Sequence, residues 1–470
     1  MKITARYFLP AALGAALGSC DKLIEGYDVN PNAAQDAPAD QQLTAVQVSE
    51  GFVLSGEMAR MAGIWSDYFT GSDRQYEGLQ NYTTVAGDYD NMWTSTYTLV
   101  LTNARIVSDK AALVQNYQLQ GIAQVLEAQM IGTATSLWGD IPYSQAFQPG
   151  VPPVFDRQTD VYNSVQTLLS TAITNLGRNG VNPEERDIYF QGNLARWTAV
   201  AHSLKARYFL HTKNYAQAAT EARLGIASPA GDLLMPYGGT VSTTANPYYD
   251  FVEINRTGYL SATGAYAVGL LQGQHSNALT NESARFQYFY TSSGSSGAAD
   301  LNTSTGVFAS DADFPLITYV ETQAILAEAL ARANDLNGSL TALNAVRTTN
   351  SDTISSPYRA GFTKVRGKTQ TAYQPYTLAN FAAGGVLNTG QSQQNALLRE
   401  ILTEKYLSLV GQIEPFNDVR RTGNIIGVPK KRTDAPSIPQ RYLIAQNEVN
   451  ANPNVPTPIP PLYEPTEVNR

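Results

Sequence analysis

The sequence predicts a mainly α-helical protein whose scaffold consists of helix pairs similar to tetratricopeptide (TPR) repeats, with long loop regions inserted between them. Residues 193–227 and 314–347 each show apolar residues at helical spacing, then a polar turn and a second helix. Such a pair cannot bury its apolar stripe alone, so several pairs are expected to stack. Long polar segments without helical spacing predict the inserted loops.

The helix pair at residues 314–347 allows specific expectations about its ends and its charges. Its first helix is expected to begin near Pro315, because a first helical turn tolerates proline. The second is expected to begin after Ser339, whose hydroxyl can cap it. Glu321 and Glu328, seven residues apart on the first helix, are expected to accept hydrogen bonds from loop backbone.

The remaining chain divides by the same spacing. TPR-like helices are expected at about 95–227 and 314–412, and no strict repeat period runs through them. Loop-rich regions are expected at about 65–93, 228–313 and 351–393. Inside the second of these regions, residues 285–290 alternate as in a strand. Residues 42–470 are expected to form one domain.

The composition describes a folded, weakly charged chain that is rich in tyrosine. Of its 470 residues, 15% are charged and 43% hydrophobic, and 27 are tyrosines. Tyrosine has an apolar ring and a polar hydroxyl, which suits half-exposed binding surfaces. The alternative is that most of these rings fill spaces between helices, and both interpretations stay open here.

The N-terminus is typical of a bacterial lipoprotein. A short basic start and an apolar stretch end in Leu-Gly-Ser-Cys, with Cys20 the only cysteine of the chain. We expect residues 1–19 to be a signal peptide, Cys20 to be lipidated, and residues 20–41 to form a tether. Without residues 1–19 the net charge falls from −8 to −10. An acidic protein without a basic patch is not expected to bind nucleic acid.

No catalytic pattern emerges from the sequence. The three histidines show no metal-ligand spacing, and the motifs of phosphate loops, serine hydrolases, dinucleotide binding and zinc proteases are absent. Several acids crowd residues 67–90, but 40 acids in the chain make chance clusters common. We expect no enzyme activity and no cofactor, and whether a structural metal such as calcium is bound stays open.

The loops do carry what sugar binding requires. Pyranose rings stack their apolar faces on aromatic side chains, while amides, acids and arginines bind their hydroxyls. Trp93 also matches the spacing of a helix core. Peptide fragments remain an alternative ligand for the same side chains. The candidate ligand-binding residues are Trp65, Tyr68, Arg74, Tyr76, Tyr82, Tyr89, Asn91, Trp93, Tyr248, Tyr249, Tyr259 and Tyr288.

Five pieces of the sequence together resemble the SusD/RagB family of surface lipoproteins of Gram-negative bacteria. The likeness spans nearly the whole mature chain, and it depends on the order and spacing of pieces that are individually degenerate. The pieces are Leu17–Cys20 with Asn30-Pro31-Asn32, residues 138–143 with Ala146-Phe147, residues 314–347, residues 404–406 with 414–423, and residues 439–442 with Glu448 and Asn450.

The resemblance implies a SusD-like single domain, with TPR-like helix pairs on one side and a loop-built ligand-binding face on the other. It also implies a lipid-anchored location in the outer membrane, facing the cell exterior. The implied function is to bind a glycan, an oligosaccharide or polysaccharide, and deliver it to a SusC-like TonB-dependent transporter. A peptide-binding accessory of such a transporter and a stand-alone adhesin or scaffold are the alternatives.

Overall fold

The computed structural model describes residues 37–148, 150–292, 298–351 and 373–470. The expected signal peptide, Cys20 and most of the tether lie outside the described residues. The first described helix, α1 (Ala39–Ser55), begins three residues before the domain start expected at residue 42. It ends at Ser55, and Gly56 separates it from α2 (Glu57–Trp65).

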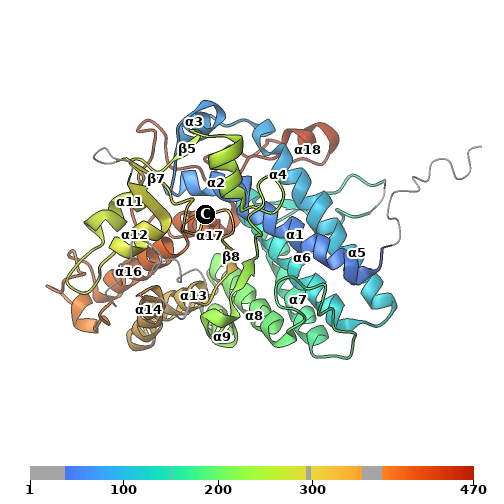
Figure 1. Cartoon of the computed structure of the whole chain (residues 1–470), viewed down its shortest axis with the longest axis horizontal. Helices are drawn as coiled ribbons and strands as arrows, with labels where there is room; N and C mark the ends of the chain where they lie inside the picture. The colour runs from blue at the N-terminus through green and yellow to red at the C-terminus, as the bar shows by residue number, and fades with distance from the viewer. Residues whose placement is uncertain (1–36, 149, 293–297, 352–372) are drawn as a thin grey trace, which may run out of the picture.

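The TPR-like scaffold is a row of antiparallel helices in which each helix packs against the next. The row runs from α5 to α9 and continues directly into α13 and α14, with α16 packed on α13. Figure 1 shows it along the lower side of the molecule, from α5 on the right to α14 on the left. Its helices are α5 (Thr102–Leu113), α6 (Tyr117–Trp138), α7 (Gln158–Leu176), α8 (Leu194–His211), α9 (Tyr215–Leu224), α13 (Tyr319–Arg332), α14 (Leu336–Ser351) and α16 (Gln393–Ser408).

Short polar caps and small residues explain why this row forms. Asn116, Asn193 and Asn214 each accept a hydrogen bond from a backbone amide in the first turn of α6, α8 and α9. Where α6 crosses α8, a Cβ on Gly132 would lie 2.3 Å from the Tyr208 ring, so only glycine permits this approach. The mainly α, TPR-like fold expected from the sequence is confirmed.

The start of the pair at residues 314–347 differs from the expectation. Residues 314–317 form strand β8 (Phe314–Ile317), which pairs antiparallel with β4 (Leu233–Met235), and α13 begins only after Thr318 caps it. Pairing with a distant strand prevails over the local helical spacing. α14 begins at Leu336, where Asp335 accepts a hydrogen bond from the amide of Gly338. Ser339 is therefore inside the helix and does not cap it.

The two glutamates of α13 also have partners other than those expected. Glu321 accepts two hydrogen bonds of 2.6 Å from the Arg207 guanidinium, and Glu328 pairs with Arg421. All four side chains are buried. A buried carboxylate requires a charged partner more than a backbone amide, and arginine satisfies both of its oxygens.

The inserted segments contain more short helices than the sequence indicates. Residues 285–290, expected as a strand, are mostly helical, and only Tyr290 enters a strand. The elements of the first loop region and its continuation are α2, β1 (Thr70–Gly71), α3 (Arg74–Gln80), η1 (Ala86–Tyr89), α4 (Asp90–Thr94) and the π-helical η2 (Ser95–Leu101). Those of the 228–313 insertion are η3 (Pro229–Gly231), β4, α10 (Pro247–Tyr249), η4 (Asp250–Asn255), β5 (Leu260–Ser261), α11 (Tyr266–Gly269), η5 (Leu270–Gln274), α12 (Ser283–Phe289), β6 (Tyr290–Ser292) and β7 (Ala299–Leu301).

Short antiparallel strand pairs hold these insertions in place. β4 and β8 join the two ends of the 228–313 insertion, and β6 pairs with β7 inside it. Earlier in the chain, β2 (Ile141–Pro142) pairs with β3 (Phe155–Asp156). The C-terminal part adds η7 (Leu378–Phe381), α17 (Glu414–Arg421), α18 (Gln446–Ala451) and η8 (Glu467–Asn469). Among the described residues, no helix combines the length and the apolar character needed to cross a membrane.

Candidate functional site

Two of the three loop regions expected to bind ligand come together in the structure. β1 of the first region pairs antiparallel with β5 of the second. Beside this pair, Tyr76 of α3 lies against Phe251 of η4, with ring centroids 4.7 Å apart. Residues 65–93 and 228–313 therefore share one continuous surface, on the side of the molecule opposite the row of TPR-like helices (Figure 1).

Most of the candidate aromatic residues lie inside this region and not on its surface. Trp65 donates a hydrogen bond to the Leu79 carbonyl (3.0 Å), and Tyr248 donates one to the Gly411 carbonyl (2.7 Å). Tyr68 stacks on Tyr406 and donates a hydrogen bond to its carbonyl. The nine buried candidates are Trp65, Tyr68, Tyr76, Tyr82, Tyr89, Trp93, Tyr248, Tyr259 and Tyr288. Their rings hold the loops onto the helices.

Three candidates stay accessible to solvent. Tyr249 is half-buried, while Arg74 and Asn91 are exposed. The Arg74 guanidinium lies 5.8 Å from the centre of the Tyr259 ring, at cation–π distance. Asn91 lines a cleft to which both loop regions contribute residues.

This cleft, here called cleft A, is lined by residues of both loop regions. Its volume is about 540 Å³, and it is bounded by the α1–α2 junction, by α4 with η2, and by α10 with η4. A cleft of this size accommodates a small ligand or part of a polymer. Its lining residues are Phe52, Val53, Gly56, Glu57, Met58, Arg60, Asn91, Met92, Ser95, Ser242, Pro247, Asp250, Phe251 and Asn255.

Cleft A combines apolar surface with unused hydrogen-bonding groups. The Phe52 ring is 61% exposed, and Phe251 is half-buried. Within the described part of the chain, no hydrogen bond engages the side-chain amides of Asn91 and Asn255. An apolar ligand face and a hydroxyl-bearing ligand edge therefore both find partners in this cleft.

The charges of cleft A are held in fixed positions. The buried Arg60 side chain donates a hydrogen bond from Nε to the Tyr76 hydroxyl (3.0 Å), and its guanidinium lies 4.2 Å from the Phe251 ring centre. Burial raises the pKa of Glu57, although the neighbouring Arg60 charge acts against that shift. The Ser242 amide donates a bifurcated hydrogen bond to both carboxylate oxygens of Asp250. The cleft thus offers both signs of charge.

Sequence reasoning missed most of the residues that line cleft A. One local signal existed for Phe52: it lies on α1 beside the buried Val53 and Leu54 but off the stripe that they share with Val46. An aromatic residue outside the buried stripe of a helix is a candidate for ligand contact. For Arg60 there was no such signal, because its partners come from residues 76 and 251.

Trp93 belongs to a different place from the other candidates. It lines a separate cleft of about 340 Å³ with Tyr97, Pro142 and Pro153. Its indole donates a hydrogen bond to Glu448 (3.2 Å) and packs edge-on against Trp138. The candidates therefore do not converge on a single aromatic face.

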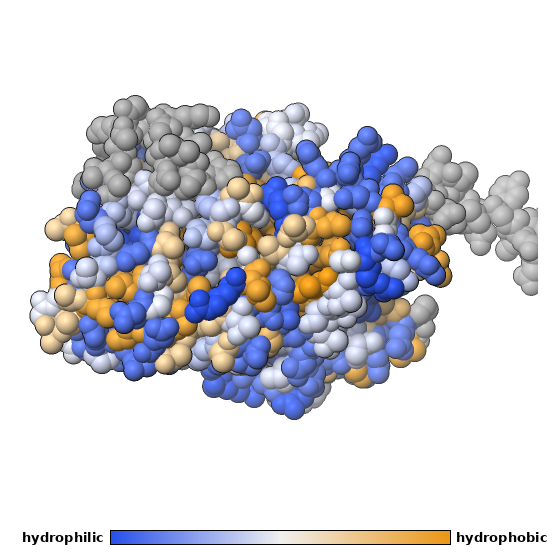
Figure 2. Space-filling model, turned by 90° about the horizontal axis from the view of Figure 1, so that it is seen from below, coloured by the Kyte–Doolittle hydropathy of each residue, from blue (hydrophilic) through white to orange (hydrophobic). Residues whose placement is uncertain are grey.

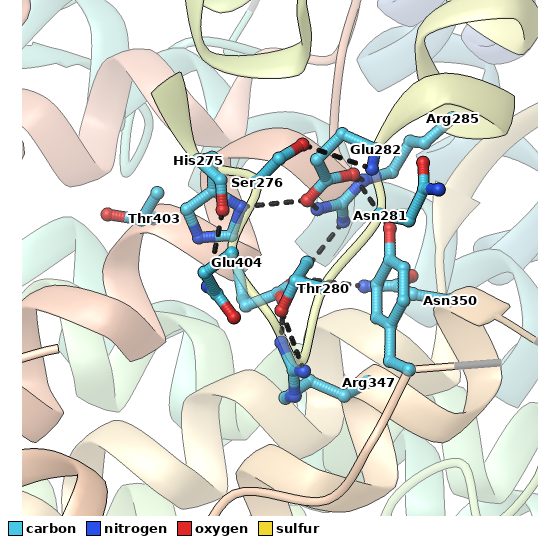
Figure 3. Close-up of polar contacts among 12 residues, drawn as sticks. His275, Ser276, Thr280, Asn281, Glu282, Arg285, Arg347, Asn350, Thr403 and Glu404 are labelled. Atoms are coloured by element: carbon cyan, nitrogen blue, oxygen red, sulfur yellow. Dashed lines mark hydrogen bonds and ion pairs between the residues drawn. The ribbon is translucent and has the colours of Figure 1, made fainter. Parts of the chain in front are cut away.

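A cluster of buried acids and bases lies under the inserted segment and includes a group with metal-ligand geometry. The ligand atoms of His275, Glu282 and Glu404 all lie within 4.8 Å of one another. Arg285 pairs with Glu282 and Glu404, and of these two carboxylates Arg347 pairs with Glu404 alone (Figure 3). Arg285 binds Glu282 through two hydrogen bonds (2.7 and 2.5 Å) and Glu404 through a third (3.0 Å). These oxygens already face a guanidinium, so the arrangement is that of an ion-pair cluster.

Histidine 275 is part of the same cluster. Its two ring nitrogens lie 2.7 Å from Glu282 and 3.1 Å from Glu400. Burial lowers the pKa of His275, but the two carboxylates outweigh it and raise that pKa to about 10. Because the pKa is raised on folding, the stabilisation is fully present below the ordinary histidine pKa of about 6.5 and is lost as the pH rises through about 10.

Comparison with known proteins places this architecture among SusD homologues. Residues 32–234 match a SusD-like family model described as starch-binding and associating with the outer membrane. A SusD/RagB family protein from Bacteroides thetaiotaomicron has a TM-score of 0.67 at 20% identity, covering 92% of this chain and 99% of its own. A chitin-binding SusD homologue from Flavobacterium johnsoniae has a TM-score of 0.63 at 17% identity, covering 88% and 92%.

A SusD homologue from Bacteroides fragilis has a TM-score of 0.69 at 15% identity and covers 92% of this chain and all of its own. No curated protein matches the chain. Identities this low establish a common fold and not a common ligand. The resemblance of the sequence to the SusD/RagB family is thus confirmed, through the SusD-like match of residues 32–234 and through a fold shared with SusD homologues along most of the chain.

Proposed function

We propose that this protein binds an oligosaccharide or polysaccharide at the outer face of the outer membrane and passes it to a SusC-like TonB-dependent transporter. The observation that carries the proposal is cleft A, where the two loop regions meet and where apolar rings lie beside unused amides. We further propose that the protein binds its ligand without cleaving it. The names of the similar proteins support a glycan, because one family model is described as starch-binding and one homologue as chitin-binding.

The chemistry of cleft A suits a sugar. The exposed Phe52 ring offers a surface on which the C–H face of a pyranose stacks, and Asn91 and Asn255 offer donors and acceptors to its hydroxyls. Each such contact contributes on the order of 1 kcal/mol, so a few of them give micromolar to millimolar affinity. Weak binding allows the protein to release its cargo to a transporter.

Changing Phe52 and Asn91 to alanine together is expected to weaken glycan binding about tenfold or more. The double variant loses one stacking surface and one amide, about 1.5 kcal/mol or more together. Calorimetry with maltoheptaose and chitohexaose, on the full chain in a sugar-free detergent, measures the change. Phe52 is mostly exposed, so the fold is expected to survive, and circular dichroism checks this.

The matched control replaces Gln217 and Leu224 by alanine, because both are exposed on α9 in the TPR-like row. It removes an amide and an apolar side chain without touching cleft A. Equal affinity in the cleft variant and in this control would show that cleft A is not the site. The charged groups Glu57, Arg60 and Asp250 also suit a peptide. If a mixture of peptides binds and none of the tested glycans does, the ligand is a peptide fragment.

The anchor is proposed from the sequence, since Cys20 lies outside the described residues. Replacing Cys20 by alanine is expected to release the protein from the membrane fraction, because the thiol that receives the lipid is lost. Protease added to intact cells is expected to digest the wild-type protein. If the wild type stays membrane-bound and is untouched by protease, it does not face the exterior.

Docking to the transporter is proposed for the outer side of the row of TPR-like helices, away from the two loop regions that form cleft A. Figure 2 shows the side with α7, α8, α9 and α14, where hydrophobic patches alternate with hydrophilic ones. Such a mixed surface is typical of non-obligate protein interfaces. Purification through a C-terminal tag in mild detergent is expected to recover a TonB-dependent transporter. Recovery of the lipoprotein alone from cells that make both would favour an adhesin or scaffold.

A further inference from the structure

A second cleft, here called cleft B, lies in the 228–313 insertion and shares no lining residue with cleft A. Its volume is about 500 Å³, and it is bounded by η5, α12 and β6 and by the turn after β7. Its described lining residues are Leu271, Gln272, Ser276, Asn281, Ser283, Phe286, Gln287, Tyr290, Thr291, Ser292, Asn302, Ser304 and Thr305.

The lining of cleft B is polar but carries no charge among the residues that the structure describes there. Its polar members are amides and hydroxyls, whereas cleft A contains Glu57, Arg60 and Asp250. The amides of Gln272 and Gln287 make no hydrogen bond within the described chain, and both are accessible to solvent. Leu271 and Phe286 supply apolar surface. Cleft B thus combines apolar walls with free hydrogen-bonding groups and excludes ionic recognition.

The walls of cleft B are fixed by the buried ion-pair cluster beneath it. Arg285 of α12 pairs with Glu404 (Figure 3), and His275 pairs with Glu400. Both ends of the segment that forms one wall are therefore bound to α16. Ser276 and Asn281 of this wall lie between these two anchors. A helix of seven residues would not keep its place alone, so the ion pairs pre-form the cleft.

Two local features hold the remaining walls. Asn302 donates a hydrogen bond to the Gln287 carbonyl (2.7 Å) and accepts one from the Thr305 amide (3.1 Å), so the turn after β7 is bound to α12. Leu271 and Gln272 lie on the π-helical η5, directly before Gly273. The backbone at Gly273 has a φ of 151°, which favours glycine. Short π-helical turns occur often at functional sites, and cleft A borders one as well, in η4.

We infer that cleft B is a separate subsite that takes uncharged sugar units and rejects acidic or cationic ones. This inference rests on the proposed glycan-binding function and adds the class of glycan. Neutral hydroxyl and amide groups of a sugar can replace their hydrogen bonds to water by hydrogen bonds to the free amides of cleft B, with little loss of free energy. A carboxylate or an ammonium group would lose its hydration without gaining an opposite charge from any described lining residue.

Hydrogen exchange of the full chain in a sugar-free detergent tests the inference directly. The probes are maltoheptaose, cellohexaose and chitohexaose, each beside a charged counterpart. The first two are oxidised at C6 to uronic acids, and the third is fully deacetylated and used at mildly acidic pH. Neutral probes are expected to slow exchange in residues 271–292 and 299–305, and charged probes are expected to leave these segments unchanged.

A variant pair adds a second measurement. Replacing Gln272 and Gln287 by alanine is expected to abolish the protection of these segments by neutral probes and to weaken binding at least fivefold. Gln217→Ala on α9 is the matched control, because this exposed glutamine lies in the TPR-like row. The variant is checked by its unfolding midpoint, so that loss of protection is not confused with loss of structure.

The outcomes separate this inference from the proposed function. If neutral glycans protect only segments of cleft A, the protein binds glycans but cleft B is not a subsite. If charged counterparts protect residues 271–292 as well as neutral ones do, the selectivity is wrong. If no glycan protects any segment, the proposed function fails, and this inference fails with it.

Discussion

Replacing Tyr76, Tyr82 and Tyr89 by alanine together is expected to unfold the protein. Their side chains are only 3%, 5% and 0% exposed, although all three lie in a loop region expected to face ligand. Each change removes a buried ring and leaves a cavity, at a cost of about 3–5 kcal/mol. The sum approaches or exceeds the whole stability of a typical domain, about 5–15 kcal/mol.

The polar contacts of these tyrosines add to the loss. The Tyr76 hydroxyl accepts a hydrogen bond from Arg60, which is buried and would lose this partner. The Tyr82 hydroxyl accepts one from the Lys431 amide, far along the chain (2.9 Å). Tyr89 packs against Tyr442, with ring centroids 5.4 Å apart. The three rings therefore connect the first loop region to the core and to the C-terminal segment.

Circular dichroism and thermal unfolding measure this prediction. The triple variant is expected to lack a cooperative transition near that of the wild type. Phe52→Ala is the control for stability, because it removes a ring of similar size from a side chain that is 61% exposed. A triple variant that unfolds cooperatively at nearly the wild-type temperature would contradict the placement of these rings in the core.

The helical scaffold is predictable from sequence because its signals are local. Apolar residues at helical spacing, asparagine caps and small residues at crossings lie within a few positions of one another, as at Asn193 and Asn214. The prediction fails at Pro315, where a strand replaces a helical turn. The partner of that strand is β4, some eighty residues earlier, and no local pattern contains it.

The candidate site was less accessible to sequence reasoning, for a physical reason. The inserted segments contain few aliphatic residues, so their aromatic rings must form the local core themselves. Trp65 packs against Phe416 and Tyr442, and Tyr68 stacks on Tyr406. These partners lie more than 300 residues away, and sequence spacing cannot distinguish such a buried ring from one that awaits a ligand. Arg74 and Asn91 stay exposed because polar side chains do not serve to fill this local core.

Buried charge presents the same difficulty. No local pattern shows that Glu282 and Arg285 meet Glu404, which lies more than a hundred residues further along the chain. In the structure they are 0% exposed and bind one another across α12 and α16. Burying these charges costs desolvation free energy, which offsets much of the attraction between them. We therefore assign the ion pairs a positioning role: they hold the seven-residue α12 and the cleft that this helix borders.

Replacing Arg285 by methionine is expected to destabilise the protein by roughly 3–5 kcal/mol, because two buried carboxylates lose their common counter-charge. Urea unfolding at neutral pH measures the change, and Arg223→Met, at an exposed position on α9, is the matched control. Removing the Glu282 charge as well, by Glu282→Gln, is expected to recover part of the loss, because a buried carboxylate without its guanidinium partner is then replaced by a neutral amide.

The pH dependence provides an independent check of the same cluster. His275 is held between Glu282 and Glu400, with Arg285, Arg347, Glu404, Tyr373 and Tyr376 around these acids. In the wild type, its contribution to stability is expected to decline between neutral pH and about pH 10. His275→Gln is expected to be less stable at pH 7 and to show a smaller decline. Two results together would contradict a charged cluster that stabilises the fold beneath cleft B. The first is a wild-type stability that does not change over this pH range, and the second is an Arg285→Met variant no less stable than Arg223→Met.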